Sequence, residues 1–232
     1  MKKKKKVLVV DIGGTHVKLW MAPNERRKFD SGPRMTPAQW LRRTKQTTRG
    51  WKFDAVSIGF PAPVRDGHIM HDPKHLGPGW ARYNFKKAIK KPTAIINDAA
   101  MQALGSYHGG RMLFLGLGTG LGSAMVWKNT LLPLELGDLP YRDGKIIEHF
   151  LGKPGVAKLG ERAWKSEVRH AVQQLKKSFV ADYVVVGGGN AKRFATLPEG
   201  IKPGNNRNAY LGGVRLWEVD DRTGKKKWNI IS

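Results

Sequence analysis

The sequence contains no cysteine, and this absence excludes several kinds of site. Without thiols the chain cannot form disulfides, thiolate nucleophiles or any zinc site built with cysteine ligands, and its redox compartment stays open. A long hydrophobic run is also missing. The longest mainly apolar stretch, Leu113–Trp127, has 15 residues and is interrupted by four glycines. A membrane-spanning helix needs about 20 apolar residues, so we expect no membrane span.

The N-terminal segment resembles the beginning of a signal peptide only briefly. Lys2–Lys6 precede the apolar residues Val7–Val10, but Asp11 and two glycines end the apolar part too early. We therefore predict a cytoplasmic protein. The lysine run could be a nuclear or nucleic-acid tag, although such runs are more often solvated chain ends, which is the interpretation we favour.

Acidic residues are scarce. Lys and Arg number 42 against 18 Asp and Glu, which gives a formal net charge of +24. Such a charge favours polyanionic partners, namely nucleic acid, an anionic membrane or a phosphorylated substrate. The positive residues are dispersed, which argues against one dedicated groove; pairs and runs occur at Arg42–Arg43, Lys86–Lys87, Lys90–Lys91, Lys176–Lys177 and Lys225–Lys227.

What the chain does contain is enough apolar material for a core, in alternating patterns. Its 232 residues are 40% hydrophobic, with eight Trp and eight Phe, which suits one large domain or two small ones. Buried-type strands are predicted at 7–12, 16–22, 53–60, 93–97, 111–117, 121–127 and 182–186.

Helices are predicted between these strands. Thr36 as N-cap and Pro37 at the first helical position indicate a helix that ends near Gly50. Within 161–179, apolar residues at spacings of three and four form one helix face. The alternation of strands and helices predicts an α/β fold.

Two segments repeat one pattern. VLVVDIGGTHVKLW at 7–20 and LFLGLGTGLGSAMVW at 113–127 each run from an apolar strand through a Gly-rich turn with a threonine into another strand. Thr15 and Thr119 are 104 positions apart. The pair suggests two duplicated lobes, each with a turn whose backbone N–H groups and hydroxyl bind phosphate. Taken singly, either hairpin could be an ordinary surface turn.

Other phosphate motifs do not fit. The second turn has glycines at 116, 118, 120 and 122 and leads into a strand, so it is not a helix-opening dinucleotide loop. Gly-Lys occurs three times and is never followed by Ser or Thr, so there is no Walker A loop.

Polar residues follow the apolar strand at 93–97. Asn97 and Asp98 stand at the head of a predicted helix. A carboxylate at this place can accept the proton of a hydroxyl that attacks a phosphoryl group. Alternatively, Asp98 serves only as the N-cap of the helix.

A second acidic group lies in LELGDLPYRDGKIIEH. Glu135, Asp138 and Glu148 would suit sugar hydroxyls, or they belong to an ordinary acidic loop. His68, His71 and His75 lie in a Gly/Pro loop with no fixed helical face, which disfavours a metal site. Metalloprotease and nucleophile-elbow motifs are absent from the sequence.

In this order the motifs resemble the ROK family of sugar kinases, closest to its polyphosphate glucokinase-like branch. The resemblance covers nearly the whole chain and is carried by DIGGTHVK, GFPAPVRDGHI, INDAA, LGLGTGLGSAMV, ELGDLPY, the region of Glu148 and VVVGGGN. It implies an actin-like ATPase (ribonuclease H-like) fold, with α/β lobes at 1–108 and 109–232 around a central cleft. The last helix, near 206–218, would fold back on the first lobe.

The resemblance also implies an activity and roles for residues. The reaction would transfer a phosphoryl group from ATP or inorganic polyphosphate, with Mg²⁺, to the 6-hydroxyl of glucose or a related hexose. Asp98 would be the general base, and Asp11 would place Mg²⁺ through water. The sugar would contact Asn97, Glu135, Asp138, Glu148 and Pro61; the donor phosphates would contact Gly13, Gly14, Thr15, Lys18, Gly118, Thr119 and Gly120; and Gly187, Gly188 and Gly189 would lie beside a nucleotide base.

The sequence departs from the family pattern in three places. Asp138 stands where the family usually has a sugar-binding His, and an ionised Asp only accepts hydrogen bonds. The Cys-rich zinc motif of many relatives is missing, and His16 replaces a common Lys. We expect a homodimer and no specific nucleic-acid partner. A sugar-binding sensor without turnover and a polyanion- or nucleic-acid-binding protein stay as alternatives.

Overall fold

A computed structural model describes residues 5–205 and 207–231 of the chain. The beginning of the lysine run, Lys2–Lys4, lies outside these residues, as does the first position of the helix expected at 206–218. Within the described residues, no helix is both long and apolar enough to cross a membrane.

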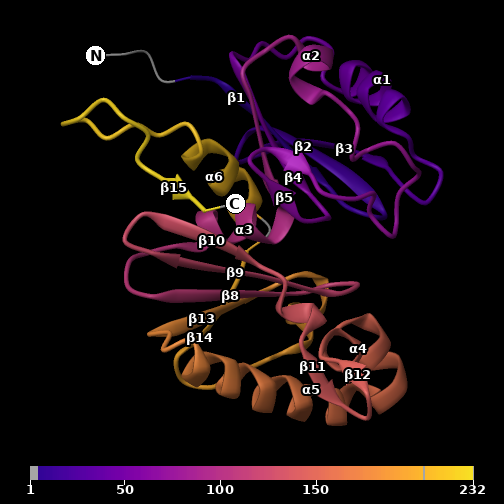
Figure 1. Ribbon diagram of the computed structural model, residues 1–232, viewed down its shortest axis with the longest axis vertical. Helices are drawn as coiled ribbons and strands as arrows, with labels where there is room; N and C mark the ends of the chain where they lie inside the picture. Colours follow the sequence, from indigo (N-terminus) through magenta and orange to yellow (C-terminus); the bar gives the residue numbers. More distant parts are fainter. Residues whose placement is uncertain (1–4, 206, 232) are drawn as a thin grey trace.

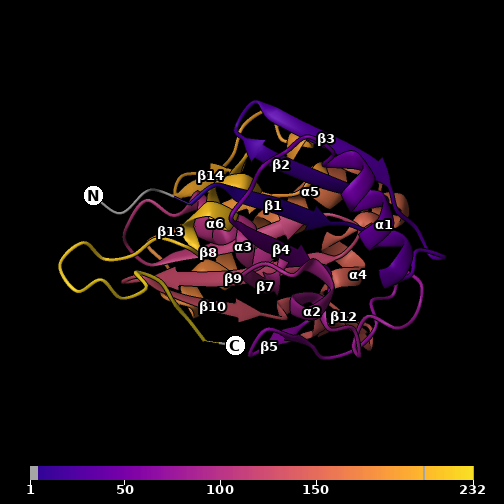
Figure 2. The same ribbon diagram turned by 90° about the horizontal axis from the view of Figure 1, so that it is seen from above.

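Five strands form the first sheet, in the spatial order β3 (Glu25–Asp30), β2 (His16–Ala22), β1 (Val7–Ile12), β4 (Ala55–Phe60) and β7 (Thr93–Asn97). The first three strands pair antiparallel, whereas β1, β4 and β7 run parallel. Seen from above, the strands follow one another in this order (Figure 2). The carboxyl ends of β1 and β7, which carry Asp11 and Asn97, therefore point to the same edge of the sheet.

The second sheet repeats this arrangement. Its order is β14 (Ile201–Pro203), β13 (Tyr183–Gly187), β8 (Met112–Leu117), β9 (Leu121–Trp127), β10 (Thr130–Leu134) and β15 (Asn229–Ile230). Strands β8, β9 and β10 pair antiparallel, and β8, β13 and β14 run parallel. Without β15, the sheet has the same order and directions as the first. The boundary between lobes at residues 108 and 109 stays a prediction.

Six helices complete the described fold (Figure 1). Helices α3 and α6 lie between the two sheets. They can approach closely because Gly105 and Gly212 have no Cβ, which at either position would collide with the backbone of the other helix. Their bounds are α1 (Pro37–Thr47), α2 (Phe85–Ile89), α3 (Asp98–Ser106), α4 (Glu148–Leu151), α5 (Lys153–Ser178) and α6 (Asn208–Arg215); short elements are β5 (Val64–Arg65), β6 (His68–Ile69), β11 (Pro140–Arg142), β12 (Lys145–Ile146) and the 3₁₀ turns η1 (Leu136–Asp138) and η2 (Gly189–Arg193).

Three apolar clusters hold these layers together. One packs the aromatic side chains of Trp40, Trp80 and Phe85 against the first sheet, and another packs Trp164 on α5 against the second sheet. The third lies between the sheets around α3 and α6. Helix α6 is also tied to the first sheet, since Ser57 Oγ donates to the carbonyl of Gly213 at 2.6 Å.

Some element bounds differ from those expected from the sequence. The strand expected at 53–60 begins at Ala55, and the helix expected within 161–179 begins earlier, at Lys153, with a break at Gly160 where φ is +75°. Strand β3 was not expected because its sequence, ERRKFD, is mostly charged. It is an exposed edge strand, where charged side chains remain solvated.

Candidate active site

The start of helix α3 lies between the two sheets. A Cβ at Gly59, on β4, would be 3.2 Å from the Cα of Asp98. A Cβ at Gly122, on β9, would be 2.7 Å from the Cβ of Ala99. Because both positions are glycine, the first turn of α3 can approach both sheets, and Asp98 is placed where the two halves meet.

Asn97, rather than Asp98, caps helix α3. The Oδ1 atom of Asn97 accepts the N–H of Ala100 at 3.1 Å, whereas Asp98 is the first residue of the helix and accepts the N–H of Ala99 at 2.7 Å. The alternative that Asp98 is the N-cap is therefore wrong. Strand β7 ends at Asn97, so Asn97 occupies the capping position and Asp98 the first helical position. Within the described residues, Oδ2 of Asp98 has no hydrogen-bond partner.

The carboxyl of Asp98 holds its proton unusually strongly. Burial and then the negative charge of Asp11 raise the pKa of Asp98 from 3.8 to about 7; Glu135 adds to the rise. Asp11 is 5% exposed at the end of β1, and its Oδ2 lies 3.0 Å from Nζ of Lys18. A carboxyl with a pKa near neutrality can take up a proton from a reacting group and release it again.

The first Gly-rich turn, Gly13–Thr15, joins β1 to β2. The N–H of Gly13 donates to the carbonyl of His16 at 3.0 Å and closes the hairpin. In the described part of the chain, the N–H groups of Gly14 and Thr15 have no backbone acceptor. Gly14 also permits close packing, since a Cβ there would be 2.7 Å from the Cβ of His75. Unpaired N–H groups in such a turn suit phosphate oxygens.

The second turn, Gly118–Gly120, has a similar hydrogen-bonding pattern. The N–H of Gly118 donates to the carbonyls of Gly116 and Gly120, while the N–H groups of Thr119 and Gly120 have no backbone acceptor among the described residues. Asn190 donates from Nδ2 to the carbonyl of Gly118 at 3.0 Å. Asn190 was not among the predicted site residues, although it directly follows the run of three glycines in VVVGGGN.

Glu148 lies against this second turn. Its Oε2 accepts the N–H of Leu121 at 3.1 Å. A Cβ at Gly120 would collide with the Glu148 carboxylate, and one at Gly137 would be 3.2 Å from Oε2. Two glycines thus make the space in which this carboxylate sits.

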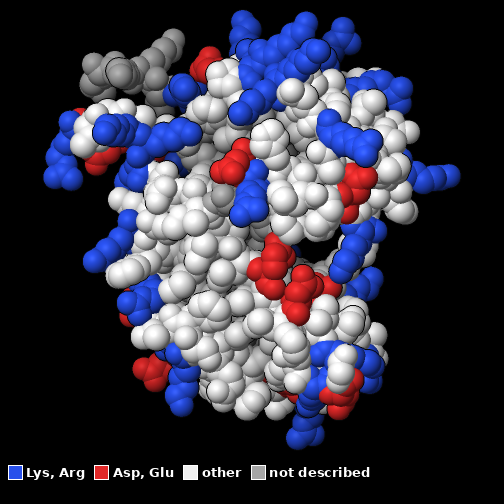
Figure 3. All heavy atoms as spheres, in the orientation of Figure 1, with Lys and Arg blue, Asp and Glu red and all other residues white. Residues whose placement is uncertain are grey.

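The two other predicted sugar ligands belong to the same acidic group. Partial burial and then the charge of Asp138 raise the pKa of Glu135, while His71 and Lys74 lower it. These last two residues come from the loop after β6, in the first half of the chain. Figure 3 shows acidic side chains grouped at mid-height beside a hollow, whereas Lys and Arg crowd the upper end of the molecule.

Pro61 is placed beside Asn97 by the register of the first sheet. It follows Phe60, which pairs with Asn97, and it is half-buried. Asn97 is 7% exposed, and its Nδ2 lies 3.5 Å from the carbonyl of Ala62. The amide of Asn97 therefore faces the loop after β4, at the same sheet edge as Asp98.

Beside the second turn lies a cavity of about 320 Å³. Gly187 and Gly188 line it, and Gly188 has a φ of +84°, close to the backbone of Leu117. Gly189 is exposed and does not line the cavity. The remaining lining residues were not among the predicted site residues; they are Gln102, Phe114, Ala191, Lys192, Phe194, Pro203, Gly204 and Asn205.

The three histidines of the loop GHIMHDPKH do not converge. Across residues 5–205 and 207–231, no group of three or more His, Asp or Glu side chains could hold a metal ion. His71 and His75 are instead found beside the acidic group and the first turn, respectively.

Two known proteins are similar in sequence to this chain. The polyphosphate glucokinase of Mycobacterium leprae is 24% identical over 220 residues, which cover 84% of this chain and 67% of that protein. The glucokinase of Pyrobaculum calidifontis is 24% identical over 133 residues; the match covers 55% of this chain and 45% of that protein, so the chain spans less than half of that relative's length.

A solved structure shows the fold. The inorganic polyphosphate/ATP-glucomannokinase of an Arthrobacter species superposes with a TM-score of 0.77 at 21% identity, over 90% of this chain and 96% of that one. The fold is that of the actin-like ATPases. The model of the ROK family matches residues 7–133, which include the first turn, Asp98 and the second turn. The chain belongs to the ROK family.

Proposed function

We propose that this protein is a sugar kinase that transfers a phosphoryl group from inorganic polyphosphate or ATP to the 6-hydroxyl of glucose or a related hexose. The observation that carries the proposal is the position of Asp98. Its carboxyl has a pKa of about 7 and lies where the two halves meet, on a helix that touches β4 and β9. Two turns with unpaired N–H groups and an acidic group complete the set that phosphoryl transfer requires.

In the proposed reaction Asp98 is the general base. Its Oδ1 is engaged by the N–H of Ala99, so Oδ2 accepts the proton of the sugar hydroxyl. The hydroxyl oxygen forms a bond to the terminal phosphorus of the donor, and the bond from that phosphorus to its bridging oxygen breaks. The leaving phosphate keeps the electron pair, and its charge is balanced by the turn N–H groups and by Lys18.

Asp11 fits a role in holding Mg²⁺. In phosphoryl-transfer sites Mg²⁺ is usually bound by one or two carboxylates and by substrate phosphates, and so it needs no cage of protein ligands. Asp11 is a buried carboxylate beside the first turn, which satisfies this requirement. When bound, Mg²⁺ neutralises phosphate charge; Lys18, at 3.0 Å from Asp11, supplies positive charge at the same place.

The acidic group suits the sugar. Glu135, Asp138 and Glu148 offer acceptors for hydroxyl groups, and the amide of Asn97 can donate as well as accept. Pro61 would form part of the wall. Because Asp138 only accepts when ionised, we expect it to favour a hydroxyl that donates, and so to affect which hexose binds.

Two observations bear on the phosphoryl donor. The cavity beside Gly187 and Gly188 has aromatic walls and a volume of about 320 Å³, which suits a nucleotide base. The net charge of +24 suits polyphosphate. We therefore propose that both donors are used. We also propose that the protein acts in the cytoplasm as a homodimer. In each subunit the two lobes, 1–108 and 109–232, would close over the substrates.

The deciding experiment is an assay of sugar-phosphate formation with Mg²⁺, glucose and a small panel of hexoses, run with ATP and with polyphosphate. Product from any pair supports the kinase. A folded protein that binds a hexose without forming product would instead be a sensor, for which the replacement of His by Asp138 is the specific argument. Binding of neither sugar nor donor would refute both.

A further inference from the structure

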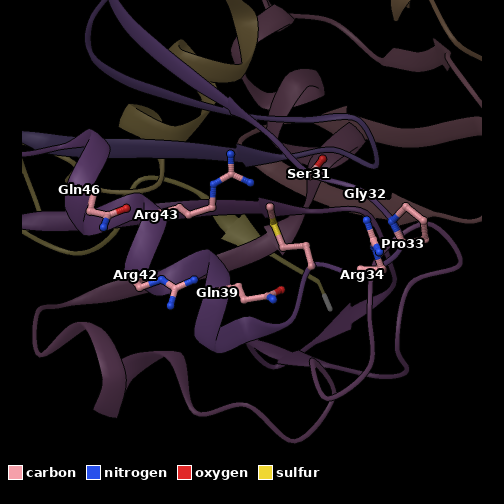
Figure 4. A pocket seen from close by; sticks show the side chains of 9 residues that line it. Ser31, Gly32, Pro33, Arg34, Gln39, Arg42, Arg43 and Gln46 are labelled. Atoms are coloured by element: carbon pink, nitrogen blue, oxygen red, sulfur yellow. The ribbon is translucent and has the colours of Figure 1, made fainter.

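A groove of about 780 Å³ lies outside the candidate active site, between the loop after β3 and helix α1 (Figure 4). The loop contributes small residues and Arg34, and the helix contributes two arginines and two glutamines. The lining residues are Ser31, Gly32, Pro33, Arg34, Met35, Gln39, Arg42, Arg43 and Gln46.

This groove is joined to the first Gly-rich turn by hydrogen bonds. Ser31 donates from Oγ to the carbonyl of Gly13 at 2.5 Å and from its N–H to the carbonyl of Thr15 at 2.9 Å. One end of the groove thus touches the segment that would hold the donor phosphates. A chain of phosphates that extends out of the active site past Thr15 would meet the groove next.

The arginines of the groove are suited to an anion. Arg43 is held in place, because it donates to the carbonyl of Asp30 at 2.7 Å and its guanidinium lies 4.9 Å from the ring centre of Phe29. Arg34 and Arg42 are exposed, and neither forms an ion pair with a described carboxylate. Guanidinium groups without a carboxylate partner are well matched to phosphate oxygens.

The neighbourhood adds charge of the same sign. Residues 25–49 contain eight Lys or Arg and two Asp or Glu. The side chains of Gln39 and Gln46 lie on the same helix, about 10 Å apart along its axis from the rise per residue. The oxygen of Gln39 accepts the N–H of Thr36, which leaves its NH₂ group to donate. The groove therefore presents donors along a line rather than at a point.

We infer that this groove binds the distal phosphates of a linear inorganic polyphosphate whose terminal phosphate lies at the first turn. The inference rests on the proposed function and adds a location for the rest of the donor chain. The dispersed positive charge of the sequence argued against one dedicated groove. In the folded chain, however, Arg34, Arg42 and Arg43 line the same groove. We expect tripolyphosphate and ATP, which have only three phosphates, not to reach Arg34 and Arg42.

The test compares two double variants. R34Q/R42Q removes two positive charges from the groove, and K86Q/K87Q removes two from exposed positions on α2, outside it. We expect R34Q/R42Q to lower kcat/KM with long-chain polyphosphate about 10-fold, which is the loss of one charge-assisted hydrogen bond. Its kcat/KM with ATP and tripolyphosphate, and all values of K86Q/K87Q, should stay within about twofold of wild type.

A second measurement keeps the inference separate from the kinase proposal. Calorimetric titration of long-chain polyphosphate into the protein without sugar, at physiological salt, should give a Kd that rises about 10-fold in R34Q/R42Q. Equal losses in the two double variants, or equal competition by single-stranded DNA, would show nonspecific attraction and overturn the groove. If binding behaves as expected but no donor supports turnover, the groove stands and the kinase proposal fails.

Discussion

The two halves of the molecule share one strand order but surround their Gly-rich turns differently. The first turn has the Asp11–Lys18 pair, Ser31 and His75 beside it, and beyond them lies the basic groove. The second turn has Glu148 against it. The same type of turn therefore lies next to a basic groove in one half and against a carboxylate in the other.

In the proposed function, this difference divides the work between the two halves of a repeated scaffold. Both turns offer N–H groups to phosphate oxygens, but the first half adds the basic groove beside its turn, whereas the second half adds carboxylate acceptors that suit sugar hydroxyls. Asp98 lies between them, and its high pKa follows from burial and from carboxylates of both halves, Asp11 and Glu135. The raised pKa of the proposed catalytic group therefore depends on residues from both halves.

Removing the carboxylate at this meeting point should have the largest effect. We expect Asp98→Asn to lower kcat by about 10²- to 10⁴-fold, the usual contribution of a general base, with little change in glucose affinity. Steady-state kinetics and calorimetric titration of glucose separate the two. Asp221→Asn, an exposed carboxylate near the C-terminus, should leave both unchanged. A near wild-type kcat in Asp98→Asn would remove Asp98 from the mechanism.

The pH dependence of the rate should reveal the same residue. The base works only when ionised, and its pKa is raised to about 7, so activity is lost as the pH falls. We expect kcat/KM for the sugar to fall about tenfold per pH unit below pH 7 and to level off above it. Asp98→Asn should lack this limb. An inflection near pH 4 would mean that Asp98 is solvated in the working enzyme.

Much of the fold follows from the sequence, because the apolar runs at 7–12, 93–97 and 121–127 mark strands with the observed bounds. The exposed edge strand β3 does not, since its charged side chains carry no apolar pattern. The paired turns were visible as a repeat. The packing role of Gly59 and Gly122 could not be predicted, because it depends on which helix packs against these glycines.

The same limit applies to the groove and to Asn190. Arg34 and Arg42 are eight positions apart in a chain rich in Arg, and only the packing of α1 against the loop after β3 puts them in one hollow. Asn190 follows a run of glycines, but its bond to Gly118 joins residues 72 positions apart. Long-range contacts of this kind leave no local signal in a single sequence.

The helix pair that joins the halves offers a structural test of the comparison. A Cβ at Gly212 would collide with the carbonyl of Met101, so Gly212→Ala should destabilise the protein by about 1–3 kcal/mol, as overpacking usually does. Thermal unfolding followed by circular dichroism measures the loss. Leu211→Ala, whose side chain is 41% exposed on the same helix, should change stability by less than about 0.5 kcal/mol.

The smallest expected effect concerns the second turn alone, and it distinguishes sugar contacts from donor contacts. In Gly120→Ala the new methyl group would displace the Glu148 carboxylate, whereas the Cβ of Gly118→Ala meets nothing within 4 Å. We expect Gly120→Ala to raise the KM for glucose about 5- to 10-fold, because a hydrogen bond to a charged group is weakened rather than removed, and Gly118→Ala to leave it unchanged. Any effect of Gly118→Ala should appear in the KM for the donor. Equal glucose KM values in the two variants would mean that Glu148 does not contact the sugar, and the division of work between the halves would lose its clearest support.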